Sequence, residues 1–236
     1  MLELKKVTKK YKGIPVVNEV SFTIENGQVL GLVGPNGAGK STCVSMIATL
    51  QKPDSGEILF NGTNIVKNPD AIRSKLGYVP QDIALYEQLS GMDNLKFWGK
   101  SYGVPSDQLG DEIKRVCGII SFDETLLKKR VRDYSGGMKR RLNIGVALLH
   151  RPELVILDEP TTGIDIQSGM HILNAIMELR QNGTAVIYVG HYMEEVEKIS
   201  THICYLENGV CKGFGTVMEV LYQNSVKSLS ELILSR

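Results

Sequence analysis

The sequence predicts an α/β protein with a mainly parallel core sheet, an N-terminal antiparallel β subdomain and an inserted helical subdomain. The first part of the chain alternates apolar and polar positions, as half-buried strands do. Further along, short apolar runs alternate with helical spacing, which favours a parallel sheet joined by right-handed crossovers. Between these parts, residues from about 85 to 150 have a mostly helical pattern.

The N-terminal strands come first. Residues 2–7 alternate, and residues 16–24 are rich in Val, Phe, Thr and Ile, so both stretches predict strands. The Asn-Gly pair at 26–27 is typical of a hairpin turn. Residues 28–33 form an apolar run, which predicts a buried strand that ends at Gly34.

A helix and a further strand follow before the helical middle. Helical spacing begins after Gly39 and stops at the Pro-Asp-Ser-Gly segment 53–56, and residues 57–60 predict another strand. In the helical middle, we expect residues 93–95 to open one helix and residues 105–107 to cap the next.

Strand and helix patterns resume after the helical middle. Residues 154–157 predict a buried strand, residues 166–180 a helix and residues 185–189 a second buried strand. A strand pair around the Asn-Gly at 208–209 and two small helices come last. This order indicates one α/β core that the helical segment interrupts.

A chain of 236 residues is long enough for one domain with a sizeable core. We therefore expect a single domain over residues 1–236, in which about 1–84 and 151–236 form the α/β core with its β subdomain. Residues from about 85 to 150 would form the helical subdomain. The sequence contains no internal repeat and no long linker.

The bulk properties argue against several classes of protein. The net charge of +1, without a basic patch, argues against a nucleic-acid partner. The four cysteines have no metal-ligand spacing, so we interpret them as buried, reduced residues of a cytoplasmic protein. The sequence has neither a signal-peptide pattern nor an apolar run of membrane-spanning length. Any spanning helices would therefore come from another chain.

The strongest chemical signal is a glycine-rich phosphate loop after the strand at 28–33. It fits the pattern G-x-x-x-x-G-K-[ST], and its residues are Gly34, Pro35, Asn36, Gly37, Ala38, Gly39, Lys40 and Ser41, followed by Thr42. Glycines let N–H groups turn toward phosphate oxygens, and the helix N-terminus adds its positive end. Lys40 would reach the β- and γ-phosphates, and the Ser41 hydroxyl would bind Mg²⁺. The loop predicts the core of a P-loop nucleoside triphosphatase that binds ATP.

Two carboxylates, Asp158 and Glu159, directly follow the apolar run at 154–157. A buried strand would bring them to the carboxyl edge of the sheet, where open α/β sheets bind ligands. We expect Asp158 to hold Mg²⁺ and Glu159 to polarise the water that attacks the γ-phosphate. Alone, such a pair could simply be solvated charge at a strand end. Together with the phosphate loop, it predicts that the protein hydrolyses ATP.

A second candidate anion site is Ser135-Gly136-Gly137, just ahead of helical spacing over residues 139–149. A hydroxyl, two glycines and a helix N-terminus suit a phosphate group. Ser135 taken alone would equally fit a simple helix cap. One nucleotide does not need two such sites, so the second would serve the nucleotide of a partner.

Several short motifs occur in a fixed order along the chain. They are the phosphate loop, Tyr78-Val79-Pro80-Gln81, Tyr134-Ser135-Gly136-Gly137-Met138, Asp158-Glu159-Pro160, Gly163-Ile164-Asp165 and His191. This set resembles the ATP-binding cassette (ABC) family over essentially the whole chain. It is most similar to the ATP-binding subunits of bacterial exporters of drugs, polysaccharides or ions. No other P-loop family carries Ser-Gly-Gly just before its acidic strand.

The resemblance implies a head-to-tail dimer with two ATP molecules between the subunits. The turn at Ser135, Gly136 and Gly137 of one subunit would contact the γ-phosphate held by Lys40 of the other. The second subunit would be another copy of this chain or a close relative.

The resemblance also implies roles for single residues. Tyr11 would stack on adenine, although it could simply be an exposed tyrosine at a strand end. Gln81 would contact Mg²⁺ and the attacking water, and Asp165 would couple the two sites across the interface. His191 would contact the γ-phosphate, although by itself it could be a structural residue at a strand end.

The chain departs from the family pattern in two places. Met138 stands where Gln is usual, and it cannot make the hydrogen bonds of an amide. Gly190 stands before His191 where Thr or Ser is more common. We expect Ser135 and the glycine N–H groups to carry the phosphate contact regardless.

The sequence therefore predicts an ATPase subunit, with ATP and Mg²⁺, that powers export by a separate transmembrane permease. It would lie in the cytoplasm on the inner face of the membrane, held by the permease near Gln81, Leu85, Tyr86 and Glu87. The alternative is a soluble ABC ATPase of DNA repair or translation, but such proteins usually carry long arms, tandem cassettes or basic surfaces. A non-catalytic regulator is a further alternative, which Asp158, Glu159 and His191 argue against.

Overall fold

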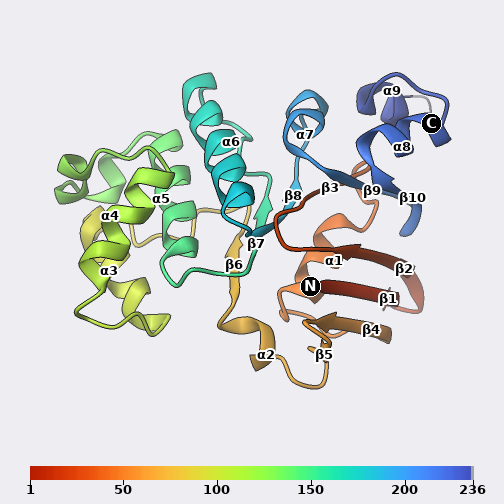
Figure 1. Ribbon diagram of the computed structural model, residues 1–236, viewed down its shortest axis with the longest axis horizontal. Coiled ribbons are helices and arrows are strands. Elements are labelled where there is room, and N and C mark those ends of the chain that lie inside the picture. The colour runs from red at the N-terminus through yellow and green to blue at the C-terminus, as the bar shows by residue number, and fades with distance from the viewer. Residues whose placement is uncertain (235–236) are drawn as a thin grey trace.

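A computed structural model, which describes residues 1–234, contains two β-sheets and a helical region at one end (Figure 1). The smaller sheet is antiparallel, with strand order β2-β1-β4-β5. Its strands are β1 (Leu2–Tyr11), β2 (Ile14–Ile24), β4 (Ser55–Phe60) and β5 (Thr63–Asn64). The N-terminal antiparallel β subdomain that the sequence predicts is therefore confirmed.

The larger sheet has the strand order β10-β9-β3-β8-β7-β6. Its strands are β3 (Val29–Val33), β6 (Leu76–Val79), β7 (Leu154–Asp158), β8 (Ala185–Val189), β9 (His202–Glu207) and β10 (Val210–Thr216). All neighbours pair in parallel except β9 and β10, which pair antiparallel around the Asn-Gly turn. The core sheet is thus mainly parallel, as the sequence predicts.

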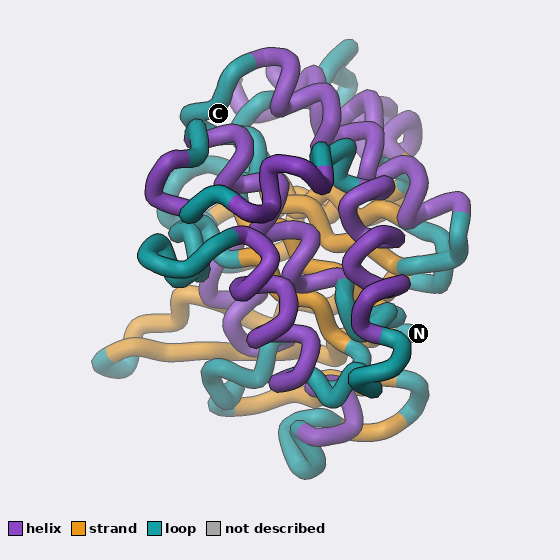
Figure 2. Tube along the Cα trace, turned by 90° about the vertical axis from the view of Figure 1, so that its left-hand side faces the viewer, coloured by secondary structure: helices purple, strands orange, loops and turns teal. Residues whose placement is uncertain are grey.

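The helices lie on both faces of the core sheet and in the helical region (Figures 1 and 2). The α-helices are α1 (Lys40–Ile47), α2 (Asp70–Arg73), α3 (Gly91–Ser101), α4 (Leu109–Ile119), α5 (Gly136–Leu148), α6 (Ile166–Gln181), α7 (Met193–Ile199), α8 (Val217–Gln223) and α9 (Leu229–Leu234). Two short 3₁₀ helices, η1 (Glu124–Lys128) and η2 (Val131–Asp133), join α4 to α5. Helices α3, α4 and α5 pack on one another and form the helical region.

The core strands are buried on both faces, which explains their unbroken apolar sequences. In β7, Val155 and Leu157 pack into one hydrophobic cluster, whereas Leu154 and Ile156 pack into the other. This division follows the two-residue period of a strand. The first cluster lies under α3 to α7, and the second lies between the core sheet, α1 and the antiparallel sheet.

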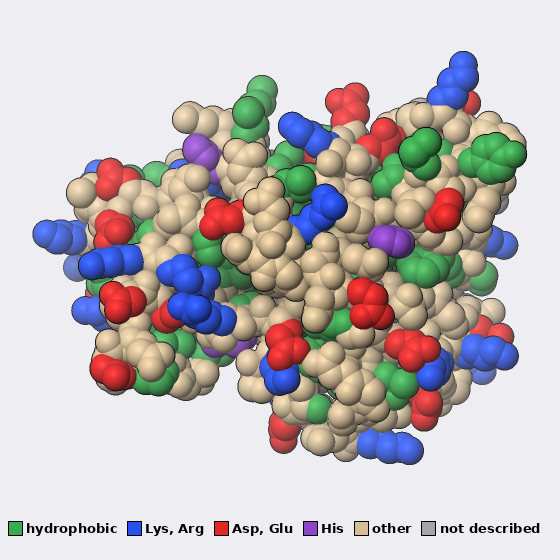
Figure 3. Space-filling view, in the orientation of Figure 1, with side chains coloured by type: hydrophobic (Ala, Val, Ile, Leu, Met, Phe, Trp, Pro, Cys, Tyr) green, Lys and Arg blue, Asp and Glu red, His purple; other side chains and the backbone are tan. Residues whose placement is uncertain are grey.

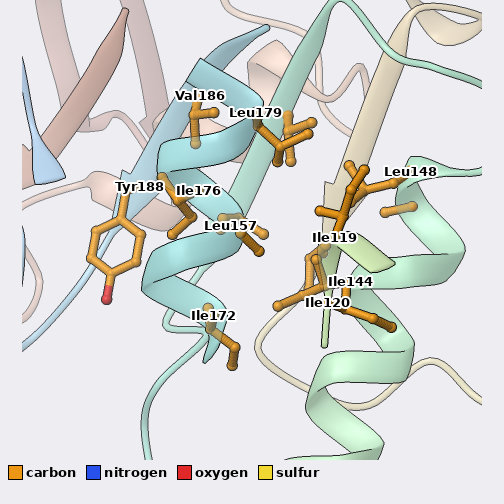
Figure 4. Packing of buried hydrophobic residues seen from close by; sticks show 14 of the residues in the cluster. Ile119, Ile120, Ile144, Leu148, Leu157, Ile172, Ile176, Leu179, Val186 and Tyr188 are labelled. Atoms are coloured by element: carbon orange, nitrogen blue, oxygen red, sulfur yellow. The ribbon is translucent and has the colours of Figure 1, made fainter. Parts of the chain in front are cut away.

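The first cluster also joins the helical region to the core. Figure 4 shows Ile144 and Leu148 of α5 close to Ile119 and Ile120 at the end of α4. Helix α5 in turn packs against α6 and β6.

Some local predictions were wrong. The Asn-Gly turn at 26–27 does not close a hairpin, because β2 pairs with β1 and β3 belongs to the other sheet. Helix α3 starts earlier than expected, at the N-cap Ser90, whose side chain accepts a hydrogen bond from the N–H of Asp93. Helix α4 starts after Gln108 without a side-chain cap. A turn motif alone does not reveal which strands pair.

Within residues 1–234, the structure has no helix that is both long and apolar enough to cross a membrane. The surface shown in Figure 3 carries acidic and basic side chains close to one another, without a broad field of one sign.

Gly31 in β3 offers a test of core packing. A Cβ atom at this position would lie 2.6 Å from Val196 Cγ1 and 2.7 Å from Ile203 Cδ1. We expect Gly31→Ala to lower the free energy of unfolding by about 1–3 kcal/mol through overpacking. Urea denaturation would measure the change. The control is Gly118→Ala on an exposed helix position with open space around it, and an equally stable Gly31→Ala protein would contradict the packing argument.

Candidate nucleotide-binding site

The phosphate loop connects the buried strand β3 to α1 at the carboxyl edge of the core sheet. Gly34 has φ 149° and Gly39 has φ 97°, both in the region that favours glycine. A Cβ on Gly34 would lie 2.1 Å from the carbonyl oxygen of Leu206, and one on Gly39 would lie 2.6 Å from that of Val16. The two glycines are therefore fixed by both backbone conformation and space.

Lys40 lies inside this loop and is only 7% exposed. Its Nζ donates hydrogen bonds to the carbonyl oxygens of Gly34, at 2.7 Å, and Pro35, at 2.9 Å. Burial lowers the pKa of Lys40, and the nearby charges of Glu159 and Asp158 oppose this shift. The ammonium group is thus partly desolvated and placed to interact strongly with an anion.

The start of α1 also suits an anion. Its N-cap is Gly39, which provides no side-chain hydrogen bond to the first turn. The backbone N–H groups of a first helical turn have no partner within the helix. In α1 they belong to Lys40, Ser41 and Thr42, so backbone and ammonium donors converge on one loop, as a phosphate group requires.

Asp158 ends the buried strand β7 and is 7% exposed. Burial raises the pKa of its carboxyl group, and the negative charge of Glu159 raises it further. The positive charges of Lys40, His191 and Arg140 act in the opposite direction. The structure thus places a carboxylate where a bound cation would relieve an unfavourable burial of charge.

Glu159 follows in a left-handed backbone conformation, with φ 50°. Its N–H donates to the carbonyl oxygen of Val189 at 2.8 Å, which fixes the turn against the end of β8. Oε1 of Glu159 lies 2.6 Å from Nε2 of His191, and Oε2 accepts a hydrogen bond from Nε2 of Gln81 at 3.1 Å. The structure therefore brings together the three residues that the sequence analysis considered catalytic.

Arg140 is a site residue that the sequence analysis missed. It lies in α5, is 7% exposed, and donates from Nη1 to the carbonyl oxygen of Pro80 at 3.1 Å. Burial lowers the pKa of its guanidinium group, and the charges of Asp82, Glu159 and Asp158 oppose this shift. In sequence Arg140 stands between two other basic residues, Lys139 and Arg141, so the sequence carried no signal that singled it out.

The Ser-Gly-Gly turn lies elsewhere in the chain. Helix α5 packs into the cluster on one side of the core sheet, whereas α1 packs into the cluster on the other side. Ser135 caps α5, because its Oγ accepts a hydrogen bond from the N–H of Met138 at 3.2 Å. The helix-cap interpretation of Ser135 is therefore confirmed within one chain.

Gly137 packs against the segment that contains Asp165. A Cβ on Gly137 would lie 2.1 Å from Ser168 Oγ and 2.8 Å from Asp165 Oδ2. Asp165 is the N-cap of α6 and accepts a hydrogen bond from the N–H of Ser168, which lowers the pKa of its carboxyl group. The Ser-Gly-Gly turn and Asp165 are therefore neighbours on the surface of the same chain.

Tyr11 lies at the end of β1, and 44% of its surface is exposed. Its hydroxyl donates a hydrogen bond to Gln51, and Nζ of Lys9 lies 6.0 Å from the centre of its ring. These contacts hold the edge of the ring beside the segment that follows α1. Its role in adenine binding stays a prediction.

The fold and the site together define a class of protein. A glycine-rich phosphate loop, a desolvated lysine and an acidic pair meet at the carboxyl edge of a mainly parallel sheet. This arrangement is that of a P-loop nucleoside triphosphatase.

Comparisons with known proteins identify the family. The family described as ABC transporter matches residues 17–162. The chain is 42% identical to the linearmycin resistance ATP-binding protein LnrL of Bacillus subtilis over 235 residues, covering 100% of this chain and 75% of that protein. It is 36% identical to the Nod factor export ATP-binding protein I of Cupriavidus pinatubonensis over 211 residues, covering 89% of this chain and 64% of that protein.

A solved structure of an ATP-binding cassette has the same fold. It is a dimeric ATP-binding cassette in a post-hydrolysis state bound to ADP and Pi, with a TM-score of 0.82 and 25% identity, covering 92% of this chain and 98% of that chain. The chain belongs to the ABC transporter family. It is an ATP-binding subunit and an ATPase that powers transport.

The buried carboxyl group of Asp158 gives a test of the electrostatics. Because its pKa is raised by folding, the folded chain binds this proton more tightly than the unfolded chain. The charged form therefore costs stability once the pH exceeds the ordinary pKa of aspartate. We expect Asp158→Asn to raise the free energy of unfolding at neutral pH without nucleotide, and the gain to shrink as the pH falls toward that value.

Urea denaturation at several pH values would measure this effect. Asp165→Asn is the control, because the pKa of Asp165 is lowered and its loss should bring no gain in stability. An Asp158→Asn protein that is less stable than the wild type at neutral pH would contradict the raised pKa of Asp158.

Proposed function

We propose that this subunit binds ATP with Mg²⁺ and hydrolyses it at Glu159 to power export by a separate transmembrane permease. The observation that carries the proposal is the cluster in which one Glu159 carboxylate contacts both His191, at 2.6 Å, and Gln81, at 3.1 Å. Glu159 would accept the proton of the attacking water, and His191 and Gln81 would hold that carboxylate in place. Lys40 and the N–H groups of the phosphate loop would bind the phosphates.

The residues around Asp158 fit Mg²⁺. Hydroxyl, amide and carboxylate oxygens are available from Ser41, Gln81 and Asp158, and such oxygens are the ligands that Mg²⁺ prefers. Within residues 1–234, no three His, Cys, Asp or Glu side chains are grouped to hold a metal on their own. This suits an ion that is bound by few protein ligands together with substrate phosphates and water. When bound, the ion would neutralise charge on the phosphates.

Removal of the proposed base tests the reaction directly. Glu159→Gln keeps the size and one oxygen acceptor of the side chain but removes its basicity. We expect ATP binding to be retained and turnover to fall by roughly 10²–10⁴-fold, the range of a general base. Steady-state phosphate release and equilibrium ATP binding would measure the two effects, and Glu219→Gln, on the capping box of α8, is the control. Normal turnover in Glu159→Gln would show that another group is the base.

The second half of the site would come from another subunit. Ser135 and Gly136 are exposed, and α5 lies across the sheet from α1. The side chains of Ile166, Met170 and Tyr192 are exposed by 85%, 56% and 51%. Ile166 follows Asp165 in sequence, Met170 lies one helical turn further along α6, and Tyr192 follows His191. Exposed apolar patches mark interaction sites. We infer that this face pairs head to tail with a second copy or a close relative, with adenine stacked on Tyr11 and the two sites coupled through Asp165.

This arrangement predicts how activity depends on concentration. A lone subunit should bind ATP but hydrolyse it poorly, so specific ATPase activity should rise with protein concentration. Ile166→Asp should shift this rise to higher concentration because it places a charge in the apolar interface. Met218→Asp, which changes a residue that is 81% exposed on α8, is the matched control. Constant specific activity in a proven monomer would contradict the dimer.

The permease would dock on the helical region near Gln81. Tyr86 and Phe97 are 47% and 46% exposed and contact each other, with ring centres 5.1 Å apart. Trp98 stacks on Tyr86 at 6.1 Å and on Tyr102 at 5.9 Å. These aromatic residues form a partly exposed surface beside the segment that carries Gln81, and such surfaces suit a protein partner. Docking there would hold the subunit at the inner face of the membrane.

The names of the two relatives, linearmycin resistance and Nod factor export, support export as the direction of transport. The division into an α/β core and a helical subdomain at about residues 85–150 also remains our proposal. It is supported by the mutual packing of α3, α4 and α5.

A further inference from the structure

Tyr188 is a buried residue that takes no direct part in the proposed reaction. It lies in β8 and is fully buried. Its hydroxyl lies 3.1 Å from Oγ1 of Thr161 and donates to Oε2 of Glu195 at 2.9 Å. Thr161 Oγ1 also donates to Oε2 of Glu195, at 2.7 Å. Two buried hydroxyl groups thus share one carboxylate oxygen.

In sequence, these three residues lie close to Glu159 and His191. Thr161 lies two positions after Glu159, and Tyr188 and Glu195 lie on either side of His191. The hydrogen bond between Tyr188 and Glu195 therefore bridges the two ends of the loop that carries His191. One end is β8, and the other is the first turn of α7. The bond from Thr161 ties this loop to the turn that carries Glu159.

The Tyr188 ring also determines which residue precedes His191. A Cβ atom on Gly190 would lie 2.4 Å from Tyr188 Cε1 and 3.1 Å from its Cζ. Gly190 does not have a left-handed φ, so its backbone would accept other residues. The ring, and not the backbone, therefore requires glycine. This accounts for the glycine at position 190 of this chain.

Figure 4 shows the Tyr188 ring in the cluster that contains Ile172 and Ile176 of α6. Apolar packing on one side and the hydrogen bonds of the hydroxyl at its tip hold the ring in place. A ring held in this way cannot easily move aside for a larger residue at position 190.

We propose that Tyr188, with Thr161 and Glu195, is a positioning unit that holds His191 against Glu159. The ring sets the path of the backbone at Gly190, and the shared carboxylate fixes both ends of the loop. The proposal rests on the proposed role of His191 in turnover. A displacement of about 1 Å in such a group can lower a rate by 10²-fold.

The test compares the ATPase activity of full-length variants at concentrations where the wild type is active. We expect Gly190→Ala to lower kcat by roughly 10–100-fold while the KM for ATP changes little. The overpacking should also lower the melting temperature by a few degrees, which leaves the protein folded in the assay. The double variant Gly190→Ala with Tyr188→Val should recover much of this loss, because valine leaves room for the new Cβ. Tyr188→Phe with Gly190→Ala should not recover it, because the clashing ring atoms remain. Gly118→Ala, with open space around its Cβ, is the matched control.

Hydrogen bonding is tested separately. Tyr188→Phe and Glu195→Gln keep the size of each side chain. The first removes one hydrogen bond, and the second weakens two by removing the negative charge of their acceptor. Each should lower kcat by roughly three- to tenfold with ATP binding unchanged. These variants keep the proposal testable if Gly190→Ala does not fold.

The possible outcomes separate this inference from the proposed function. Turnover in Gly190→Ala within twofold of the wild type would overturn the inference. So would a loss of kcat that the Tyr188→Val change does not relieve, or one that is accompanied by an equal loss of ATP binding. His191→Ala distinguishes the two levels. If it keeps full turnover, the role of His191 in the proposed function fails. If it is inactive while the positioning variants are normal, only the positioning unit fails.

Discussion

The burial of charge at the carboxyl edge of the core sheet is the constraint on which the rest of the structure depends. Lys40 and Asp158 are each only 7% exposed. Charged groups taken out of water cost free energy unless opposite charge and hydrogen bonds offset the loss. Two carbonyl oxygens and two carboxylates provide the offset for Lys40, but the raised pKa of Asp158 shows that its own burial remains unfavourable. Because buried charge is costly here, the site favours the binding of a cation together with phosphate.

The segment of residues 80–86 joins this edge of the sheet to the helical region. The side chain of Gln81 donates a hydrogen bond to Glu159, while the backbone of this segment contacts side chains of α3 and α5. Arg140 of α5 donates to Pro80, Asn143 of α5 accepts from the N–H of Ala84 at 3.3 Å, and Asn94 of α3 accepts from the N–H of Tyr86 at 2.8 Å. Residues 80–86 are thus attached to the Glu159 carboxylate at one end and to α3 and α5 along their length. A displacement of the helical region would reach Glu159 through these contacts.

Sequence alone could predict the parts of the fold and site that depend on local chemistry. Fully apolar runs identified β7 and β8, and residue type with spacing identified Lys40, Asp158 and Glu159. Contacts between segments distant in sequence could not be predicted. The pairing of β1 with β4 is one example, and the hydrogen bond from Thr161 to Glu195 is another. Arg140 was missed for the same reason, since its partner Pro80 lies sixty positions away.

The cap at Ser135 and the proposed contact with a partner's phosphate do not compete for the same atoms. As a cap, Ser135 uses a lone pair of Oγ to accept from the N–H of Met138. Its hydroxyl hydrogen remains available as a donor, and so do backbone N–H groups in the first turn of α5. Ser135 and Gly136 are exposed, whereas the Met138 side chain packs against the hydrophobic cluster. Methionine in place of the usual glutamine thus strengthens the packing of this turn and leaves the phosphate donors on its outer side. The helix cap orients the same hydroxyl that the dimer would require.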